Sequence, residues 1–197
     1  MNLPNKLTLL RIILVPFFIA AILIDFPFHY LVALAVFSAA SITDMFDGKI
    51  ARKRGLVTDF GKFCDPLADK ILVLSALLCF VQNGLCNCIP VIIVLFREFA
   101  VMSVRLLAAG SGKVVAANIW GKVKTVTQII AIIVIFVLQF ALDIILGGGF
   151  IVSGEAAASL INIFYWIGEG AIWISTVFCI ISGIIYIKDN RRFISYK

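Results

Sequence analysis

The sequence predicts an all-α protein that crosses a membrane several times, with residues 1–197 forming a single domain. Of the 197 residues, 62% are hydrophobic and only 14% are charged, and the mean hydropathy is +1.11. A soluble domain usually contains about a quarter charged residues. The apolar residues also form runs long enough to cross the ~30 Å hydrocarbon core of a bilayer as helices. These observations exclude a soluble globular enzyme, a disordered chain and a coiled coil.

Six apolar segments are expected to span the membrane as helices. They are Leu7–Ile24, Tyr30–Ile50, Asp65–Val81, Ile89–Ala109, Val123–Leu146 and Ile163–Ile187. Three consecutive glycines, residues 147–149, break the chain after the fifth segment. Residues 151–162 are expected to form either an interfacial helix or the start of the sixth span. The sequence assigns no role to the region 143–170 or to Glu169 within it.

The basic residues are distributed unevenly between the connectors of these spans. All 17 Lys and Arg residues lie in or beside the N-terminus, the 51–64 connector, the 110–122 connector and the C-terminus, except Arg97 and Arg105 inside the fourth span. Because basic residues favour the cytoplasmic side of a membrane, both termini are expected in the cytoplasm. The net charge of +6 then indicates contact with an anionic lipid bilayer and no nucleic-acid partner.

Four aspartates lie near the cytoplasmic ends of the second and third spans. Asp44 and Asp47 are three residues apart, and Asp65 and Asp69 are four apart, so each pair shares one helix face. Ionised side chains are costly in a membrane and repel one another, so a bound cation is expected to neutralise them. An all-oxygen ligand set favours Mg²⁺ or Mn²⁺, as one ion or as a pair, over zinc.

Each aspartate also has a structural interpretation. Asp65 followed by Pro66 is typical of a helix N-cap, Asp47-Gly48 is typical of a turn, and Asp44 alone could be a buried hydrogen-bonding residue. Their shared membrane depth favours a joint site over separate explanations. A cation transporter is the alternative from another class, although a transporter is expected to hold its acidic residues near the bilayer midplane. A purely structural membrane protein leaves the cluster unexplained.

The aspartates belong to a longer pattern of fixed residues. The segment reads Asp44-x2-Asp47-Gly48-x2-Ala51-Arg52-x8-Gly61-x3-Asp65-x3-Asp69. It resembles the signature of the CDP-alcohol phosphatidyltransferase family at every defining position. The resemblance implies a membrane enzyme of six helices, commonly a homodimer, with a polar active-site cavity that faces the cytoplasm. It also implies transfer of a phosphatidyl group from a CDP-linked lipid to an alcohol, with release of CMP.

The resemblance assigns a role to each residue of this segment. Asp44, Asp47 and Asp65 are expected to bind the metal, and Asp69 to bind it and to act as the general base. The residues expected near the CDP-lipid are Gly48, Ala51, Arg52 and Gly61. Chemistry agrees with these roles, because glycine lets a phosphate approach the helix closely and arginine can donate two parallel hydrogen bonds to a pyrophosphate.

Pro4–Arg11 resembles the amino-terminal stretch of the bacterial members of the family. Three later segments resemble the branch that uses glycerol 3-phosphate as the acceptor, namely Phe96-Arg97-Glu98, Arg105 and Gly121–Thr125. The donor is then expected to be CDP-diacylglycerol, the product phosphatidylglycerophosphate, and the location the cytoplasmic membrane of a bacterium. The residues expected to bind the acceptor are Arg105, Arg97, Lys122, Lys113 and Thr8.

The acceptor residues have alternatives too. Arg97, Glu98 and Arg105 could instead form structural ion pairs inside the helix bundle, and Lys113 could contact anionic lipid headgroups. Serine or an inositol phosphate are alternative acceptors within the family, because the acceptor segments are looser than the aspartate pattern.

Overall fold

The computed structural model describes the backbone of residues 3–54, 59–110, 119–147 and 154–191, and the side chains of 9–43, 70–108, 119–147 and 154–191. These residues form six α-helices and no strand. The helices are α1 (Leu3–Leu23), α2 (His29–Arg54), α3 (Asp59–Gln82), α4 (Cys88–Gly110), α5 (Ile119–Gly147) and α6 (Gly154–Asp189). The all-α prediction is therefore confirmed for the described residues, and each helix overlaps one predicted span.

Several helices are longer than the spans predicted from hydropathy. Since α3 begins at Asp59, Asp65 lies inside a helix, and its interpretation as an N-cap is wrong. Since α2 continues to Arg54, the interpretation of Asp47-Gly48 as a turn is also wrong. Residues 154–162 are continuous with the rest of α6, so they begin the last helix and do not form a separate interfacial one.

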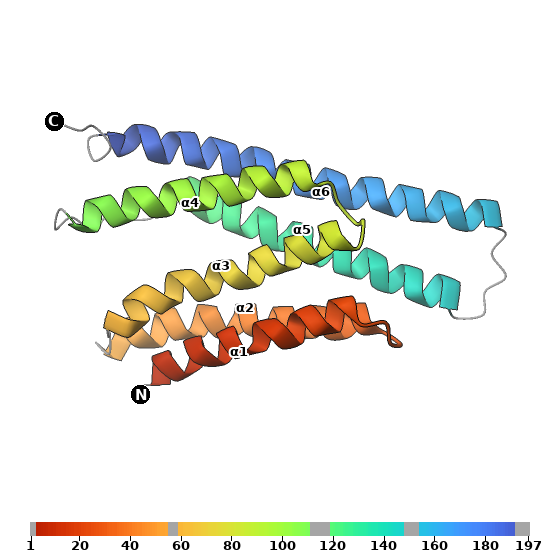
Figure 1. Cartoon of the computed structure of the whole chain (residues 1–197), viewed down its shortest axis with the longest axis horizontal. Helices are drawn as coiled ribbons and strands as arrows, with labels where there is room; N and C mark the ends of the chain where they lie inside the picture. The colour runs from red at the N-terminus through yellow and green to blue at the C-terminus, as the bar shows by residue number, and fades with distance from the viewer. Residues whose placement is uncertain (1–2, 55–58, 111–118, 148–153, 192–197) are drawn as a thin grey trace.

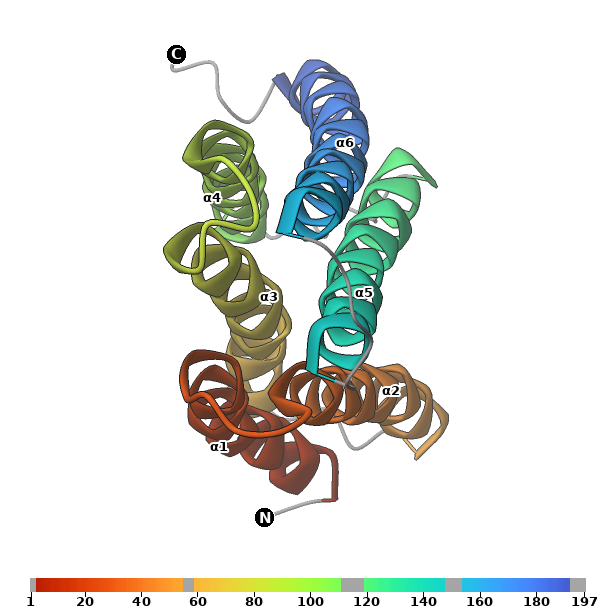
Figure 2. The ribbon, with the colours of Figure 1, turned by 90° about the vertical axis from the view of Figure 1, so that its right-hand side faces the viewer.

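The helices lie side by side along the long axis of the molecule, and the described ends nearest the N- and C-termini are at the same end (Figure 1). Viewed along this axis, they follow one another around a shared interior in the order α1, α2, α5, α6, α4, α3 (Figure 2). Each neighbouring pair in this order is in contact, including α3 with α1. The arrangement brings residues from distant parts of the sequence to one interior.

Four phenylalanines fill the centre of this interior. Phe136 of α5 has its ring centroid 6.0 Å from Phe18 of α1, 6.2 Å from Phe37 of α2 and 5.0 Å from Phe80 of α3. All four rings are fully buried. Tilted and edge-to-face contacts of this kind add about 0.5–1.5 kcal/mol per pair beyond the burial of area. The aromatic cluster thus holds four of the six helices in register.

The end of α3 is set by a glycine cap. The amide of Leu85 donates to the carbonyl of Phe80 at 2.8 Å, and the amide of Gly84 donates to that of Val81 at 3.1 Å. Gly84 has a φ of 68°, which a residue without a side chain adopts at little cost. This is the hydrogen-bond pattern of a Schellman motif, and it lets α4 begin shortly after and run back along α3.

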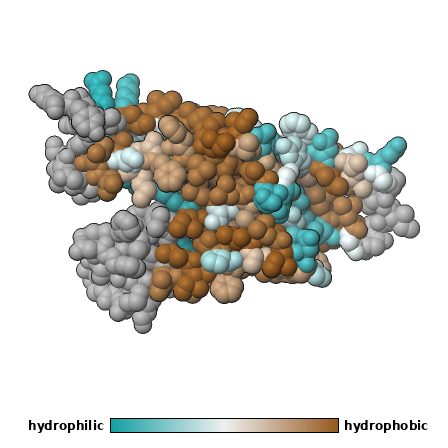
Figure 3. Space-filling model, in the orientation of Figure 1, coloured by the Kyte–Doolittle hydropathy of each residue, from teal (hydrophilic) through white to brown (hydrophobic). Residues whose placement is uncertain are grey.

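The outer surface is strongly apolar. Hydrophobic side chains cover much of the face shown in Figure 3, and on α4 Phe96 is 77% exposed and Leu106 is 73% exposed. Among the described residues, α5 and α6 are long and apolar enough to cross a membrane, while the apolar parts of α1, α2 and α3 are shorter. Soluble monomers rarely expose such surfaces, so these features are consistent with a membrane protein.

Candidate active site

The aspartate segment lies on α2 and α3, toward the end of the bundle where the described chain begins and ends (Figure 1). The helical backbone puts Asp44 and Asp47 about one turn apart on α2, and Asp65 and Asp69 about one turn apart on α3. The described side chains contain no group of three His, Cys, Asp or Glu residues that could hold a metal. Several predicted site residues are not among those whose side chains the structure describes. They are the four aspartates, Gly48, Ala51, Arg52, Gly61, Lys113 and Thr8. The metal site and the CDP-lipid site therefore stay predictions.

Next to this segment, Glu98 of α4 is the centre of a buried ion cluster. Its carboxylate accepts hydrogen bonds from the ammonium groups of Lys70 on α3 and Lys124 on α5. It also accepts a bond of 2.9 Å from Nη1 of Arg97, its neighbour on α4. The side chains of Glu98 and Lys124 are 8% and 7% exposed, whereas that of Lys70 is 23% exposed. One carboxylate thus joins three helices in a part of the bundle where water has little access.

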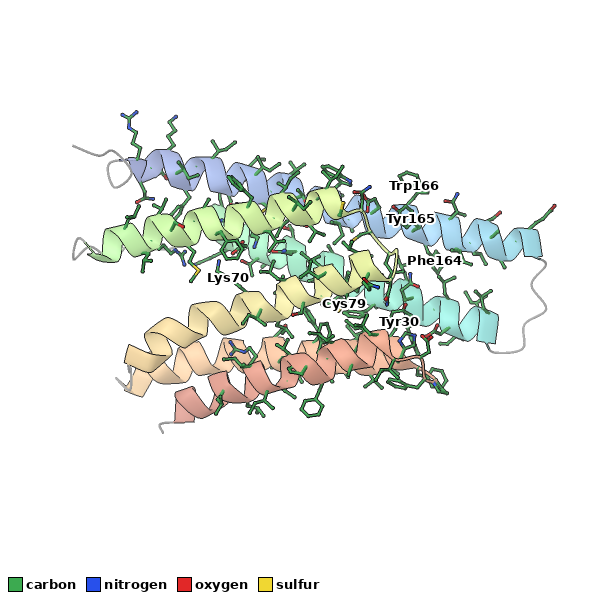
Figure 4. All side chains as sticks on the ribbon, viewed as in Figure 1. Tyr30, Lys70, Cys79, Phe164, Tyr165 and Trp166 are labelled. Atoms are coloured by element: carbon green, nitrogen blue, oxygen red, sulfur yellow. The ribbon has the colours of Figure 1, made fainter. Side chains whose placement is uncertain are left out.

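The cluster carries an excess of positive charge. Three cations surround one carboxylate, which leaves a net charge of about +2. Lys70 immediately follows Asp69 in the sequence and extends from α3 toward α4 (Figure 4). Fixed cations beside a carboxylate-rich segment are suited to bind anionic groups such as phosphates. The arrangement therefore places fixed positive charge next to the predicted metal site.

Arg97 is held inside the bundle by α6 as well as by Glu98. Its Nη2 donates to the hydroxyl of Ser182 at 2.6 Å. The helices approach so closely here that a Cβ atom added at Gly183 would lie 2.9 Å from Cγ of Arg97. Both terminal nitrogens of this guanidinium therefore have protein partners, which matches the structural alternative for Arg97. Its role as an acceptor ligand stays a prediction.

Arg105, two turns further along α4, has different surroundings. It does not pair with Glu98, and its Nε donates to the hydroxyl of Tyr186 at 3.3 Å. The guanidinium carbon lies 5.6 Å from the centroid of the same ring, within the range of a cation–π contact. Arg105 is exposed, and Lys122 at the start of α5 is exposed as well. Arg105 thus remains accessible to a ligand.

Similarity to known proteins shows the family of this chain. The CDP-alcohol phosphatidyltransferase family matches residues 1–181. The chain belongs to the CDP-alcohol phosphatidyltransferase family. A CDP-diacylglycerol–glycerol-3-phosphate 3-phosphatidyltransferase from Bacillus subtilis (strain 168) is 39% identical over 96% of this chain and 95% of its own length. The protein of the same name from Rickettsia bellii (strain RML369-C) is 35% identical over 98% of this chain and 97% of its own.

A third relative matches a shorter part. The probable phosphatidylglycerophosphate synthase of Mycobacterium tuberculosis (strain ATCC 25618 / H37Rv) is 43% identical over 66% of this chain and 64% of its own length. These matches confirm the family that the aspartate pattern indicated. In this CDP-alcohol phosphatidyltransferase, one residue of the ion cluster comes from α3, which carries the second half of the aspartate pattern. The others come from α4 and α5, which follow α3 in the sequence.

The structure assigns a contact to Glu169, for which the sequence offered no role. Glu169 of α6 is buried and accepts hydrogen bonds from the backbone amide of Asn87 at 2.8 Å and from the indole of Trp173 at 2.9 Å. It therefore ties α6 to the connector between α3 and α4, at the end of this phosphatidyltransferase away from the aspartates. The sequence could have indicated such contacts, because an acidic residue inside an apolar span requires a hydrogen-bonding or ionic partner.

A cavity of about 1060 Å³ lies at that same far end. It is lined by the α1–α2 connector, the start of α2, the last turns of α5 and Ile161 of α6. Its ionisable residues include Asp25 and Asp143, with His29 as the one basic side chain among them. Phosphorylated substrates are anions, so this acidic cavity does not suit the chemistry of a CDP-alcohol phosphatidyltransferase. The candidate active site is therefore the aspartate segment together with the cation cluster.

Proposed function

We propose that this chain transfers the phosphatidyl group of CDP-diacylglycerol to glycerol 3-phosphate, giving phosphatidylglycerophosphate and CMP in phospholipid biosynthesis. The observation that carries the proposal is the cation-rich cluster that begins at Lys70, one residue after Asp69 of the aspartate segment. A metal site beside fixed cations suits a reaction in which both substrates carry phosphate. The names of the nearly full-length relatives from B. subtilis and R. bellii support the same reaction.

In this reaction the acceptor hydroxyl attacks the phosphorus that carries diacylglycerol. A new phosphorus–oxygen bond forms, the bond to the bridging oxygen of CMP breaks, and CMP leaves with the electron pair. Asp69 takes the proton of the hydroxyl. Asp44, Asp47, Asp65 and Asp69 hold one or two Mg²⁺ or Mn²⁺ ions, which supply positive charge to the phosphate oxygens. Direct displacement is favoured because the sequence has a single histidine, so a Ser–His or Cys–His nucleophile is lacking near the aspartates.

The donor is held from the same segment. Arg52 donates hydrogen bonds to the pyrophosphate, and Gly48, Ala51 and Gly61 let the CDP moiety approach the backbone closely. The diacyl chains stay in the bilayer. Replacing Asp69 by Asn should retain most binding of the CDP-lipid while turnover falls by about 10²–10⁴-fold, the usual effect of removing a general base.

The acceptor phosphate is bound from the α4 side. Arg105 is the principal ligand, because it is exposed and its described hydrogen bond, to Tyr186, uses only Nε of the guanidinium. Lys122, Lys113 and Thr8 are further proposed ligands near the same end of the bundle. Arg97 contributes charge through the cluster of Glu98, and its described hydrogen bonds favour this indirect role over direct binding.

The protein is proposed to span the cytoplasmic membrane of a bacterium six times as a single domain, with both termini and the polar active-site cavity facing the cytoplasm. The alternation of the helix ends in Figure 1 supports this topology, because the described ends next to the basic connectors all lie at one end of the bundle. Anionic lipids are proposed to contact the basic connectors. A homodimer is proposed from the family resemblance.

Two alternatives remain open to experiment. The chain could use another acceptor, such as serine or an inositol phosphate, within the same family chemistry. The second alternative is a cation transporter that uses the aspartates, and the family membership argues against it.

The decisive assay uses purified protein, labelled CDP-diacylglycerol and a panel of acceptors. Release of CMP with glycerol 3-phosphate, and little release with serine or inositol phosphate, is the expected result. Release with another acceptor alone would refute the proposed substrate, and no release with any acceptor would refute the transferase reaction.

A further inference from the structure

The two arginines of α4 contact neighbouring positions on one face of α6. Arg97 donates to Ser182 at 2.6 Å, and Arg105 donates to Tyr186 at 3.3 Å. Ser182 and Tyr186 are four residues apart, so they point from α6 in nearly the same direction. Both are buried, at 1% and 4% exposure. One face of α6 therefore determines the surroundings of both arginines.

The two guanidinium groups differ in which nitrogens are used. Arg97 uses Nη1 for Glu98 and Nη2 for Ser182, so its two terminal nitrogens are both occupied. Arg105 uses Nε for Tyr186, and among the described residues this is its only hydrogen bond. No described residue binds Nη1 or Nη2 of Arg105, and these two nitrogens form a fork that matches two oxygens of a phosphate.

Tyr186 is itself rigidly placed. Its ring packs with Val101 and Val104 of α4 in a small apolar cluster. Its backbone carbonyl accepts a hydrogen bond of 2.9 Å from the side chain of Asn190. The same ring lies 5.6 Å from the guanidinium carbon of Arg105. The hydroxyl and the ring together restrict a long side chain that is otherwise exposed and mobile.

We propose that Tyr186 is a positioning residue that orients the fork of Arg105 toward the phosphate of the acceptor. The inference rests on the proposed function and extends it to α6, which has no part in the aspartate segment. It assigns the preference for phosphorylated over uncharged alcohols to the pair formed by Arg105 and Tyr186. Without the tyrosine hydroxyl, the arginine keeps its charge and loses its fixed direction.

The first test compares Tyr186→Phe with Tyr165→Phe. Both remove one hydroxyl from α6, and Tyr165, labelled in Figure 4, lies 21 residues nearer the start of the helix. Tyr186→Phe should raise the KM for glycerol 3-phosphate about 3–10-fold, the range of one ordinary hydrogen bond. The KM for CDP-diacylglycerol and kcat should change less than about 2-fold, within the scatter of a neutral substitution. Tyr165→Phe should change none of the three.

A double-mutant cycle tests whether Tyr186 acts through Arg105. Arg105→Ala alone should raise the acceptor KM by about 10–150-fold, the worth of a charge-assisted hydrogen bond. In that background, Tyr186→Phe should add no further change, because there is no guanidinium left to orient. Equal effects of Tyr186→Phe with and without Arg105 would overturn the inference.

Two further results keep the inference separate from protein folding and from the proposed function. If Tyr186→Phe lowers Tm more than Tyr165→Phe does, the Arg105→Lys variant is tested in place of Tyr186→Phe. Arg105→Lys keeps the tyrosine and removes the forked guanidinium. An unchanged acceptor KM in Arg105→Lys would then overturn the proposal. If the wild-type protein used only uncharged alcohols, the proposed function and this inference would both fail. If it used glycerol 3-phosphate and the cycle were additive, the role of Tyr186 alone would fail.

Discussion

Replacing Glu98 by Gln should destabilise the protein strongly, because it removes the carboxylate that three described cations share in a buried cluster. Lys70, Arg97 and Lys124 each donate to this carboxylate. Gln is of similar size and can accept a hydrogen bond, so the substitution changes charge far more than shape. The local charge rises from about +2 to about +3, and the three cations then repel one another in a region with little water.

The magnitude follows from the burial of the partners. Lys124 and Arg97 have side chains only 7% and 12% exposed, so their unpaired charges are poorly hydrated. The Lys70 side chain is 23% exposed, so its unpaired charge is better hydrated and costs less free energy. Breaking a buried ion pair by removing one partner costs about 3–5 kcal/mol. For a chain of 150–250 residues each kcal/mol lowers Tm by about 2–4 °C, so Tm should fall by about 6–20 °C.

The assay is thermal unfolding of purified protein in detergent, with Glu155→Gln as the control. Glu155 is an exposed acid in the first turn of α6, and its loss should cost less than about 1 kcal/mol. The double variant Glu98→Gln with Lys124→Met should be more stable than Glu98→Gln alone, because one unpaired cation is gone. A Tm within about 2 °C of wild type for Glu98→Gln, which corresponds to about 0.5–1 kcal/mol at most, would refute the reasoning.

Three other predictions concern the metal, the topology and the contact of α4 with α6. Activity should vanish in EDTA and return with Mg²⁺ or Mn²⁺, and full activity in chelator would contradict the metal site. An impermeant maleimide added to intact cells should label the exposed Cys88 and not Cys86, where burial raises the pKa of the thiol to about 12. Cys88→Ser should abolish this labelling, and labelling that persists would contradict the assigned site. Gly183→Ala should lower Tm by about 2–12 °C, because its Cβ would lie 2.9 Å from the Arg97 side chain. Gly170→Ala, which meets nothing within 4 Å, is the control and should not lower it.

Local patterns explain what the sequence could predict. The apolar runs located each helix, because a span must bury its own backbone polar groups and is therefore a local unit. The spacing of Asp44 with Asp47, and of Asp65 with Asp69, indicated shared helix faces, and the helical backbones of α2 and α3 agree. Helix ends were less predictable, because α2, α3 and α6 continue beyond the apolar core into polar residues that hydropathy does not count.

Partners across the bundle could not be predicted, because they depend on the order of the helices around the interior. The sequence left open structural ion pairs among Arg97, Glu98 and Arg105, and could not show which residues of other helices they contact. Glu98 bonds to Lys70 and Lys124, which are 28 and 26 residues away in the sequence. Arg105 bonds to Tyr186, 81 residues away. Only the placement of α3, α5 and α6 around α4 makes these pairs possible.

The position of the cluster has a consequence for the proposed reaction. Four aspartates contribute about four negative charges, and the proposed one or two divalent ions would offset half or all of them. The phosphates of the two substrates would add further negative charge that two such ions alone would leave uncompensated. The cluster supplies net positive charge from Lys70 onward, directly after Asp69, and Glu98 holds these cations in place when no substrate is bound. We therefore expect Glu98 to contribute to substrate binding as well as to stability. Its loss should also weaken the binding of phosphorylated substrates at temperatures where the variant is folded, because the cations would no longer be fixed in direction.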